Sequence, residues 1–300
     1  MQIRPICKPE LMSSRLSEQL YSKPTRFLLE LIQNADDNHY SSDVKPTMTI
    51  IYRKSGHLWI GCNELGFKPN NVRAICGVGG STKTTKLSQK GYIGEKGIGF
   101  KSVFRVADLV WVSSGALQFH FDKTKRLGMI APEWQPFRAH GTLKERTMFC
   151  FHVPEQSDRD AIYGDVMHLS AQMLLFLRNL MSISVRVEAN SGRLESSFAI
   201  ERVDTDAADL SISVLTRRQT HPRPSHEKTT YLIFEHTESN MPPEDKREDI
   251  TESDVVLAIP ITSRKTPILA SCEVFNFLPI RTYGLPVSSR NKRLLLCMLT

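Results

Sequence analysis

The segment from residue 27 to residue 38, FLLELIQNADDN, has the spacing of an amphipathic helix. At about 100° per residue, Glu30, Asn34 and Asp37 fall on one narrow stripe. The apolar residues cover the opposite side, and they are Phe27, Leu28, Leu31, Ile32 and Ala35. The pattern predicts a helix that packs on a core and presents a carboxylate and an amide to a ligand. A surface helix with a solvated acidic face is the alternative for this segment taken alone.

Short β-rich runs follow this helix. Two of them, at 48–53 and 57–62, flank Ser55 and Gly56 and predict a hairpin whose second strand ends in the polar segment NELGF. The pattern predicts further strands at 108–114, 117–121 and 147–154 and a short helix at 69–76.

The predicted secondary structure changes from helix to strands near residue 181. Residues 159–180 have the apolar spacing of one long helix, and the rest reads as strands divided by polar loops. This alternation predicts an α+β chain in which the second part is dominated by antiparallel sheet.

The amino-acid composition and the apolar runs limit the classes of protein to which this chain can belong. The 300 residues are 40% hydrophobic and 24% charged, which is ordinary for a globular chain with one large or two smaller domains. The N-terminal residues contain no apolar signal core, and the longest apolar run, at 173–177, is too short to cross a bilayer. We expect no membrane partner and a cytoplasmic or nuclear location. The six cysteines contain no CxxC pair, so reduced structural thiols are expected.

A glycine-rich segment, GYIGEKGIGFKSVFR at 91–105, runs into what reads as a helix start. Glycine lets the main chain approach a polyphosphate closely, so its N–H groups can surround the anion. Phe100 separates Gly99 from Lys101, which excludes the kinase-type P-loop. The preceding segment, 77–90, is small, polar and basic and reads as a loop over the site.

Four ordered motifs, LIQNADDN, NELGF, GGSTK and GYIGEKGIGFKSVF, resemble those of the GHKL ATPase superfamily of gyrase B, heat-shock chaperones, histidine kinases and MutL. They are most similar to the ATPase-like domains of sacsin-like and NO VEIN-like proteins, including long fungal relatives. The resemblance covers about residues 11–155. It implies a Bergerat-type α/β sandwich, a mostly antiparallel mixed sheet covered by helices, as the ATP-binding domain at 1–181. A smaller strand-rich α+β domain at 182–300 would follow, incomplete relative to longer relatives.

The resemblance also assigns roles to the motif residues. Glu30 would be the catalytic residue that orients water, and Asn34 would present its amide oxygen to Mg²⁺. The backbone from Gly94 to Phe100 would hold the phosphates, the segment 77–90 would be a nucleotide lid, and Thr147 would reach the adenine. The residues expected to bind the nucleotide or its metal are Asn34, Asp37, Asn63, Glu64, Gly66, Ser81, Thr82, Lys83, Gly94, Gly97, Ile98, Gly99, Phe100, Lys101 and Thr147.

The second motif departs from the superfamily pattern. Most members carry an aspartate that accepts a hydrogen bond from the adenine amino group, and Cys62 occupies that position here, with Glu64 at the first glycine. Either Asn63 or Glu64 reads the base instead, or nucleotide selectivity is weak.

These observations lead to two hypotheses. The first is an ATP-binding module with slow Mg²⁺-dependent hydrolysis, whose conformational change acts on an unidentified protein client. The alternative is a non-catalytic module of the same fold that binds a protein or a nucleic acid. The net charge of +7 is concentrated between Lys83 and Arg105, where a nucleotide explains it as well as a nucleic acid does.

Overall fold

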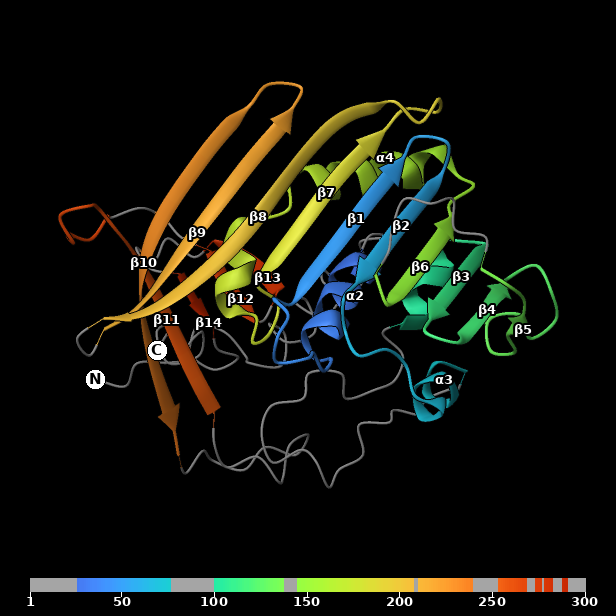
Figure 1. Ribbon diagram of the computed structural model, residues 1–300, viewed down its shortest axis with the longest axis horizontal. Helices are drawn as coiled ribbons and strands as arrows, with labels where there is room; N and C mark the ends of the chain where they lie inside the picture. Colours follow the sequence, from blue (N-terminus) through green and yellow to red (C-terminus); the bar gives the residue numbers. More distant parts are fainter. Residues whose placement is uncertain are drawn as a thin grey trace, which may run out of the picture.

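The computed structural model describes residues 26–76, 100–137, 145–207, 210–239, 253–268, 273–276, 278–282 and 288–290 (Figure 1). Its strands form one mixed sheet of 14 strands in the order β13-β12-β14-β11-β10-β9-β8-β7-β1-β2-β6-β3-β4-β5. Their bounds are β1 (Thr47–Arg53), β2 (His57–Cys62), β3 (Leu109–Ser114), β4 (Leu117–Asp122), β5 (Glu133–Trp134), β6 (Thr147–His152), β7 (Ser182–Glu188), β8 (Leu194–Ala207), β9 (Leu210–His221), β10 (Ser225–Glu238), β11 (Ser253–Ile261), β12 (Glu273–Asn276), β13 (Leu278–Thr282) and β14 (Ser288–Arg290).

Helices are few beside this sheet. The α-helices of the described residues are α2 (Arg26–Asp36), α3 (Pro69–Cys76) and α4 (Gln156–Met167), and the 3-10 helices are η2 (Phe100–Arg105) and η3 (Ala171–Phe176). Figure 1 shows α2 and α4 behind the central strands, while the long strands β8, β9 and β10 fan out toward one end of the molecule. None of the described helices combines the length and the hydropathy that a membrane-spanning segment needs.

The predicted helix-covered α/β sandwich is wrong, because the strands build one continuous mixed sheet. β1 pairs in parallel with β7, and β7 pairs antiparallel with β8. The strand-rich segment after residue 181 therefore extends the sheet that contains β1. Hydrophobic alternation indicates which side chains of a strand face inward, but it does not indicate which strand lies beside it, and this is why the sequence led to the wrong architecture.

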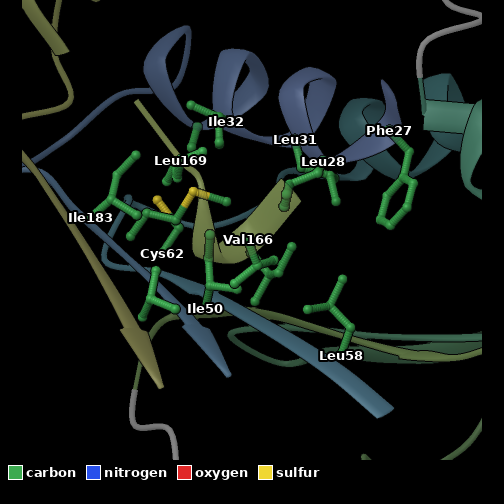
Figure 2. Close-up of a cluster of buried hydrophobic side chains, with 14 of the residues drawn as sticks. Phe27, Leu28, Leu31, Ile32, Ile50, Leu58, Cys62, Val166, Leu169 and Ile183 are labelled. Atoms are coloured by element: carbon green, nitrogen blue, oxygen red, sulfur yellow. The ribbon is translucent and has the colours of Figure 1, made fainter. Parts of the chain in front are cut away.

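The apolar stripe of α2 packs on the sheet as its spacing predicts. Figure 2 shows these α2 side chains facing Ile50 of β1, Leu58 of β2 and Ile183 of β7, all within one buried cluster. The five apolar residues predicted to be buried, Phe27, Leu28, Leu31, Ile32 and Ala35, are at most 5% exposed. Burial of a large apolar side chain contributes roughly 1.5–3 kcal/mol, so this stripe holds α2 in place and leaves its polar stripe at the edge of the core.

The long helix predicted at 159–180 is divided into α4 and η3. Arg217 of β9 donates from Nη2 to the carbonyl of Met167 at 3.2 Å and from Nη1 to that of Leu169 at 3.0 Å. A guanidinium in this position satisfies carbonyl groups at the C-terminus of a helix. The contact comes from a strand far along the chain, so local spacing could not reveal it.

Candidate functional site

The polar residues of the second motif lie where the ends of three neighbouring strands meet. Cys62 at the end of β2 pairs with Thr147 at the start of β6, and Thr147 pairs with Ser114 at the end of β3. The loop that contains Asn63 and Glu64 continues directly from β2. This arrangement brings Thr147 beside the NELGF motif, and its expected contact with adenine stays a prediction.

Asn63 is occupied by contacts within the protein. Its Oδ1 accepts a hydrogen bond from the N–H of Thr47 at 2.8 Å, and its Nδ2 donates to the carbonyl of Lys45 at 2.9 Å. Both ends of the amide therefore fasten the loop to the start of β1.

Cys62 belongs to the core rather than to a ligand site (Figure 2). The Tyr40 hydroxyl donates to the carbonyl of Ala35 at 2.7 Å, and its oxygen lies 3.0 Å from Cys62 Sγ. Burial raises the pKa of the Cys62 thiol to about 11, so the side chain stays neutral at physiological pH.

Glu64 is the unusual residue of the motif, because it is an acidic residue that is only 4% exposed. Hydrogen bonds from the side chains of Thr147 and Asn38 reach the carboxyl, but its Oε1 has no hydrogen-bond partner. Burial raises the pKa of Glu64, and these two hydrogen bonds oppose the shift. An unpartnered buried oxygen costs free energy in the ligand-free protein, so it suits an incoming N–H donor.

A directed chain of hydrogen bonds supports this carboxyl. Ser114 Oγ accepts from the N–H of Phe67 at 2.7 Å and lies 2.7 Å from Thr147 Oγ1. The Ser114 hydroxyl is therefore able to donate to Thr147, whose own hydroxyl donates to Glu64. The sequence analysis did not single out Ser114 or Asn38, since each becomes recognisable only through its contact with the motif.

Gly66 lets this loop close against the strands. Its φ is +93°, and a Cβ there would lie 3.3 Å from Ser114 Oγ and 3.1 Å from Arg146 Nε. A side chain would be strained both by the backbone and by these neighbours. The glycine therefore keeps the Glu64 loop close to Ser114.

The polar stripe of α2 is half-buried at Glu30, Asn34 and Asp37. Glu30 Oε1 accepts from Arg26 Nε at 3.2 Å. Asp37 lines a cleft of about 410 Å³ at the end of α2, together with Tyr40, Pro46 and Arg178 among others. Asp37 is the predicted site residue that lines this cleft, and the end of α2 joins the strand-end cluster through Asn38.

The residue beside Asp37 carries a contact that the sequence analysis missed. Asp36 is fully buried, and it accepts hydrogen bonds from the backbone N–H groups of residues 178–180. An acidic residue on the apolar stripe, one turn after Ile32, was the available signal. Its role is to hold α2 to another segment of the chain.

The end of the glycine-rich segment lies next to the same cluster. The ring of Phe100 packs 5.9 Å from that of Phe149 on β6, and the ring of Phe67 lies 6.1 Å from Phe149. η2 also contacts α2, and it is a 3-10 helix where the pattern read as a helix start. Phe149 thus connects the second motif with the residues that follow the glycines.

The side chain of Lys101 lies beside aromatic rings. Its Nζ donates to the carbonyl of Met129 and lies 5.0 Å from the centre of the Phe121 ring. Burial lowers its pKa. The predicted residues Ser81, Thr82, Lys83, Gly94, Gly97, Ile98 and Gly99 lie outside the described residues, so their roles stay predictions.

No group of three or more histidine, cysteine, aspartate or glutamate side chains in the described ranges could hold a metal ion. A Mg²⁺ ion that keeps most of its waters and binds phosphate oxygens needs only one protein oxygen, and the half-buried Asn34 amide can supply it.

The structure defines a mixed-sheet protein with few helices and a polar site at its strand ends. The chain is similar to Protein NO VEIN from Arabidopsis thaliana, with 32% identity over 293 residues that cover 90% of this chain and 10% of that protein. The chain spans about a tenth of that relative's length. No protein-family model matches the sequence.

Proposed function

We propose that this chain binds ATP with Mg²⁺ at the end of the sheet where α2, the loop after β2 and the start of β6 come together. The observation that carries the proposal is the buried Glu64 carboxyl, whose Oε1 lacks a partner next to Thr147. The motifs around Asn34, Glu64 and Phe100 are far apart in sequence, yet contacts through Asn38 and Phe149 connect them. Their resemblance to GHKL ATPase motifs supports the same ligand.

Glu64 is the better candidate for reading the base. The amino group of adenine is an N–H donor, and Oε1 of Glu64 is an acceptor without a partner. Both ends of the Asn63 amide are already bonded to the main chain. Thr147 and Ser114 would hold the Glu64 carboxyl in position for the base.

Hydrolysis would use the polar stripe of α2. Glu30 would accept hydrogen bonds from the attacking water and orient it, which requires its carboxylate to turn from Arg26 toward the phosphates. Asn34 would hold Mg²⁺, which neutralises phosphate charge. Lys101 would leave the Met129 carbonyl to contact a phosphate oxygen.

At the level of the whole protein, we propose a nucleotide-driven conformational module acting on a protein client in the cytoplasm or nucleus. The chain covers 10% of its relative, so this role concerns one part of a longer architecture in that relative. Mg-ATP titration of the purified chain by calorimetry tests the proposal. Saturable heat that depends on Mg²⁺ is expected, and no heat at millimolar nucleotide would refute it.

Two observations favour a non-catalytic interaction module instead. Glu30 is paired with Arg26, and Cys62 replaces the usual base-reading acid. Under this alternative the chain binds a protein partner, and Glu30→Gln leaves every measurable activity unchanged.

A further inference from the structure

Asp36 fastens the last turn of α2 to a segment far along the chain. Its carboxylate accepts hydrogen bonds from the N–H groups of Arg178 at 2.9 Å, Asn179 at 2.8 Å and Leu180 at 2.9 Å. Asn179 returns a bond from Nδ2 to the Asp36 carbonyl at 2.7 Å. The helix with the proposed nucleotide residues is thus tied to the segment that leads into β7.

Arg202 of β8 holds the same segment by its carbonyl groups. Its Nη1 donates to Leu177 O at 2.6 Å and also to Leu174 O, and its Nη2 lies 3.4 Å from Arg178 O. The backbone N–H of Arg202 donates to the carbonyl of Met181 at 2.8 Å. Arg202 is only 6% exposed, so water does not compete strongly for these bonds.

The segment 177–181 is therefore held from two sides. The Asp36 carboxylate accepts hydrogen bonds from its N–H groups, and the Arg202 guanidinium donates to its carbonyl groups. We call this pair of contacts the clamp. The Asp36 carboxylate depends on these directional bonds, since a buried charge without partners is costly. The Arg202 guanidinium also pairs with Asp204 of β8, whose Oδ2 lies 3.1 Å from its Nε. A shift of α2 cannot break the bonds cheaply, so the segment and Arg202 must follow.

The two ends of the clamp differ in what surrounds them. On α2, Asp36 is flanked by the site residues Asn34 and Asp37. On β8, the residue after Arg202 is Val203, which is 50% exposed. β8 pairs along its length with β9, whose partner is β10. The clamp is thus a buried polar connection between the proposed site and the long strands.

We propose that Asp36 and Arg202 are positioning residues that couple nucleotide occupancy at α2 to the long strands β8, β9 and β10 through the segment 177–181. The inference rests on the proposed function. It states how nucleotide binding at α2 would affect the conformation of the long strands. By thermodynamic reciprocity, weakening the clamp must weaken nucleotide binding by the same factor by which the nucleotide stabilises the clamped state.

Hydrogen exchange on the full chain, with and without saturating Mg-ATP, tests the coupling. In the parent protein, exchange should slow at residues 178–180 and along β8. In Arg202→Lys, which keeps the charge but cannot bond three carbonyls in a fork, the β8 response should disappear and ATP affinity should fall about fivefold or more. Glu201→Gln is the matched control, because Glu201 lies on the same strand and makes an exposed pair with Lys45.

The outcomes separate the coupling from the proposed function. If ATP binds and β8 responds equally in the parent and in Arg202→Lys, the coupling is overturned while nucleotide binding stands. If calorimetry detects no binding, the proposed function fails and the coupling fails with it. If Arg202→Lys does not fold, hydrogen exchange of the parent protein alone tests the coupling. ATP-dependent protection that stops at α2 overturns the proposal, and protection that continues into β8 supports it.

Discussion

The hydroxyl oxygens of Ser114 and Thr147 lie 2.7 Å apart on neighbouring strands, where β3 ends and β6 begins. Thr147 has one hydroxyl proton, and it donates that proton to the Glu64 carboxyl, so the hydrogen bond between the two hydroxyls runs from Ser114 to Thr147. The direction of these hydrogen bonds makes the Glu64 carboxyl an acceptor. Its Oε1 has no hydrogen-bond partner and could accept a hydrogen bond from a ligand. Under the proposed function, this hydrogen-bond chain would link the geometry of the loop to the choice of nucleotide.

Base selectivity should depend on Glu64 and not on Asn63. Glu64→Ala should weaken ATP relative to GTP by about 1–3 kcal/mol, because the acceptor for the adenine amino group is removed. Asn63→Ala should lower the free energy of unfolding without changing that ratio, and Cys62→Ala should leave the ratio unchanged. Competition calorimetry with both nucleotides measures these effects. An unchanged ratio in Glu64→Ala would place base reading elsewhere.

Glu30→Gln should separate binding from hydrolysis. The substitution keeps the shape of the side chain but removes the charge that orients water, so turnover should fall by about 10²-fold or more at unchanged affinity. The lost pair with Arg26 is a partly exposed i,i+4 contact, worth about 0.5 kcal/mol or less. A steady-state ATPase assay beside calorimetry gives both quantities. Equal turnover in the variant and the parent removes Glu30 from the mechanism.

Gly66→Ala and Gly115→Ala form a matched pair. Both glycines have positive φ, but a Cβ at Gly66 meets Ser114 and Arg146, whereas a Cβ at Gly115 has nothing within 4 Å. Gly115→Ala should cost about 1–2 kcal/mol from the backbone alone. Gly66→Ala should cost more and also weaken ATP binding. Denaturant unfolding with calorimetry makes the comparison, and equal effects would show that the space near Ser114 is unimportant.

The stability of the protein should depend on pH through Glu64. Its folded pKa is raised above the ordinary 4.5, mainly by burial. The contribution of this group is therefore fully present below about pH 4.5 and is lost as the pH rises through the folded pKa. Tyr40 and Cys62 lie nearby and stay neutral, because their pKa values are raised as well.

The test of this pH dependence is Glu64→Gln, whose side chain is always neutral. Its free energy of unfolding, relative to the parent, should rise as the pH increases from about 4.5 toward neutrality. Urea unfolding at a series of pH values measures the difference. A difference that stays constant with pH would mean that Glu64 titrates at its ordinary value.

Local periodicity predicted the structural features that depend only on residues close together in the sequence. The face of α2 follows from a spacing of three and four residues, and the β1–β2 hairpin follows from two strand-like runs around Gly56. Each of these features is set within one element or one turn.

Contacts between distant segments were not predictable in the same way. Asp36 bonds residues 142 to 144 positions later, and the parallel pairing of β1 with β7 joins segments that are similarly far apart. Nothing in the spacing of either segment identifies its partner. The wrong sandwich architecture and the missed role of Asp36 have this common cause.

The parallel pairing of β1 with β7 has a consequence for how the chain can be shortened. A chain that ends at Met181 would keep α2 and β2 but would leave the other edge of β1 as a row of unpaired N–H and C=O groups. Met48, Ile50 and Tyr52 would then lie on an open edge strand, the kind of surface that recruits other chains. Solubility of fragments from this protein is therefore expected to change abruptly when the cut moves across β7.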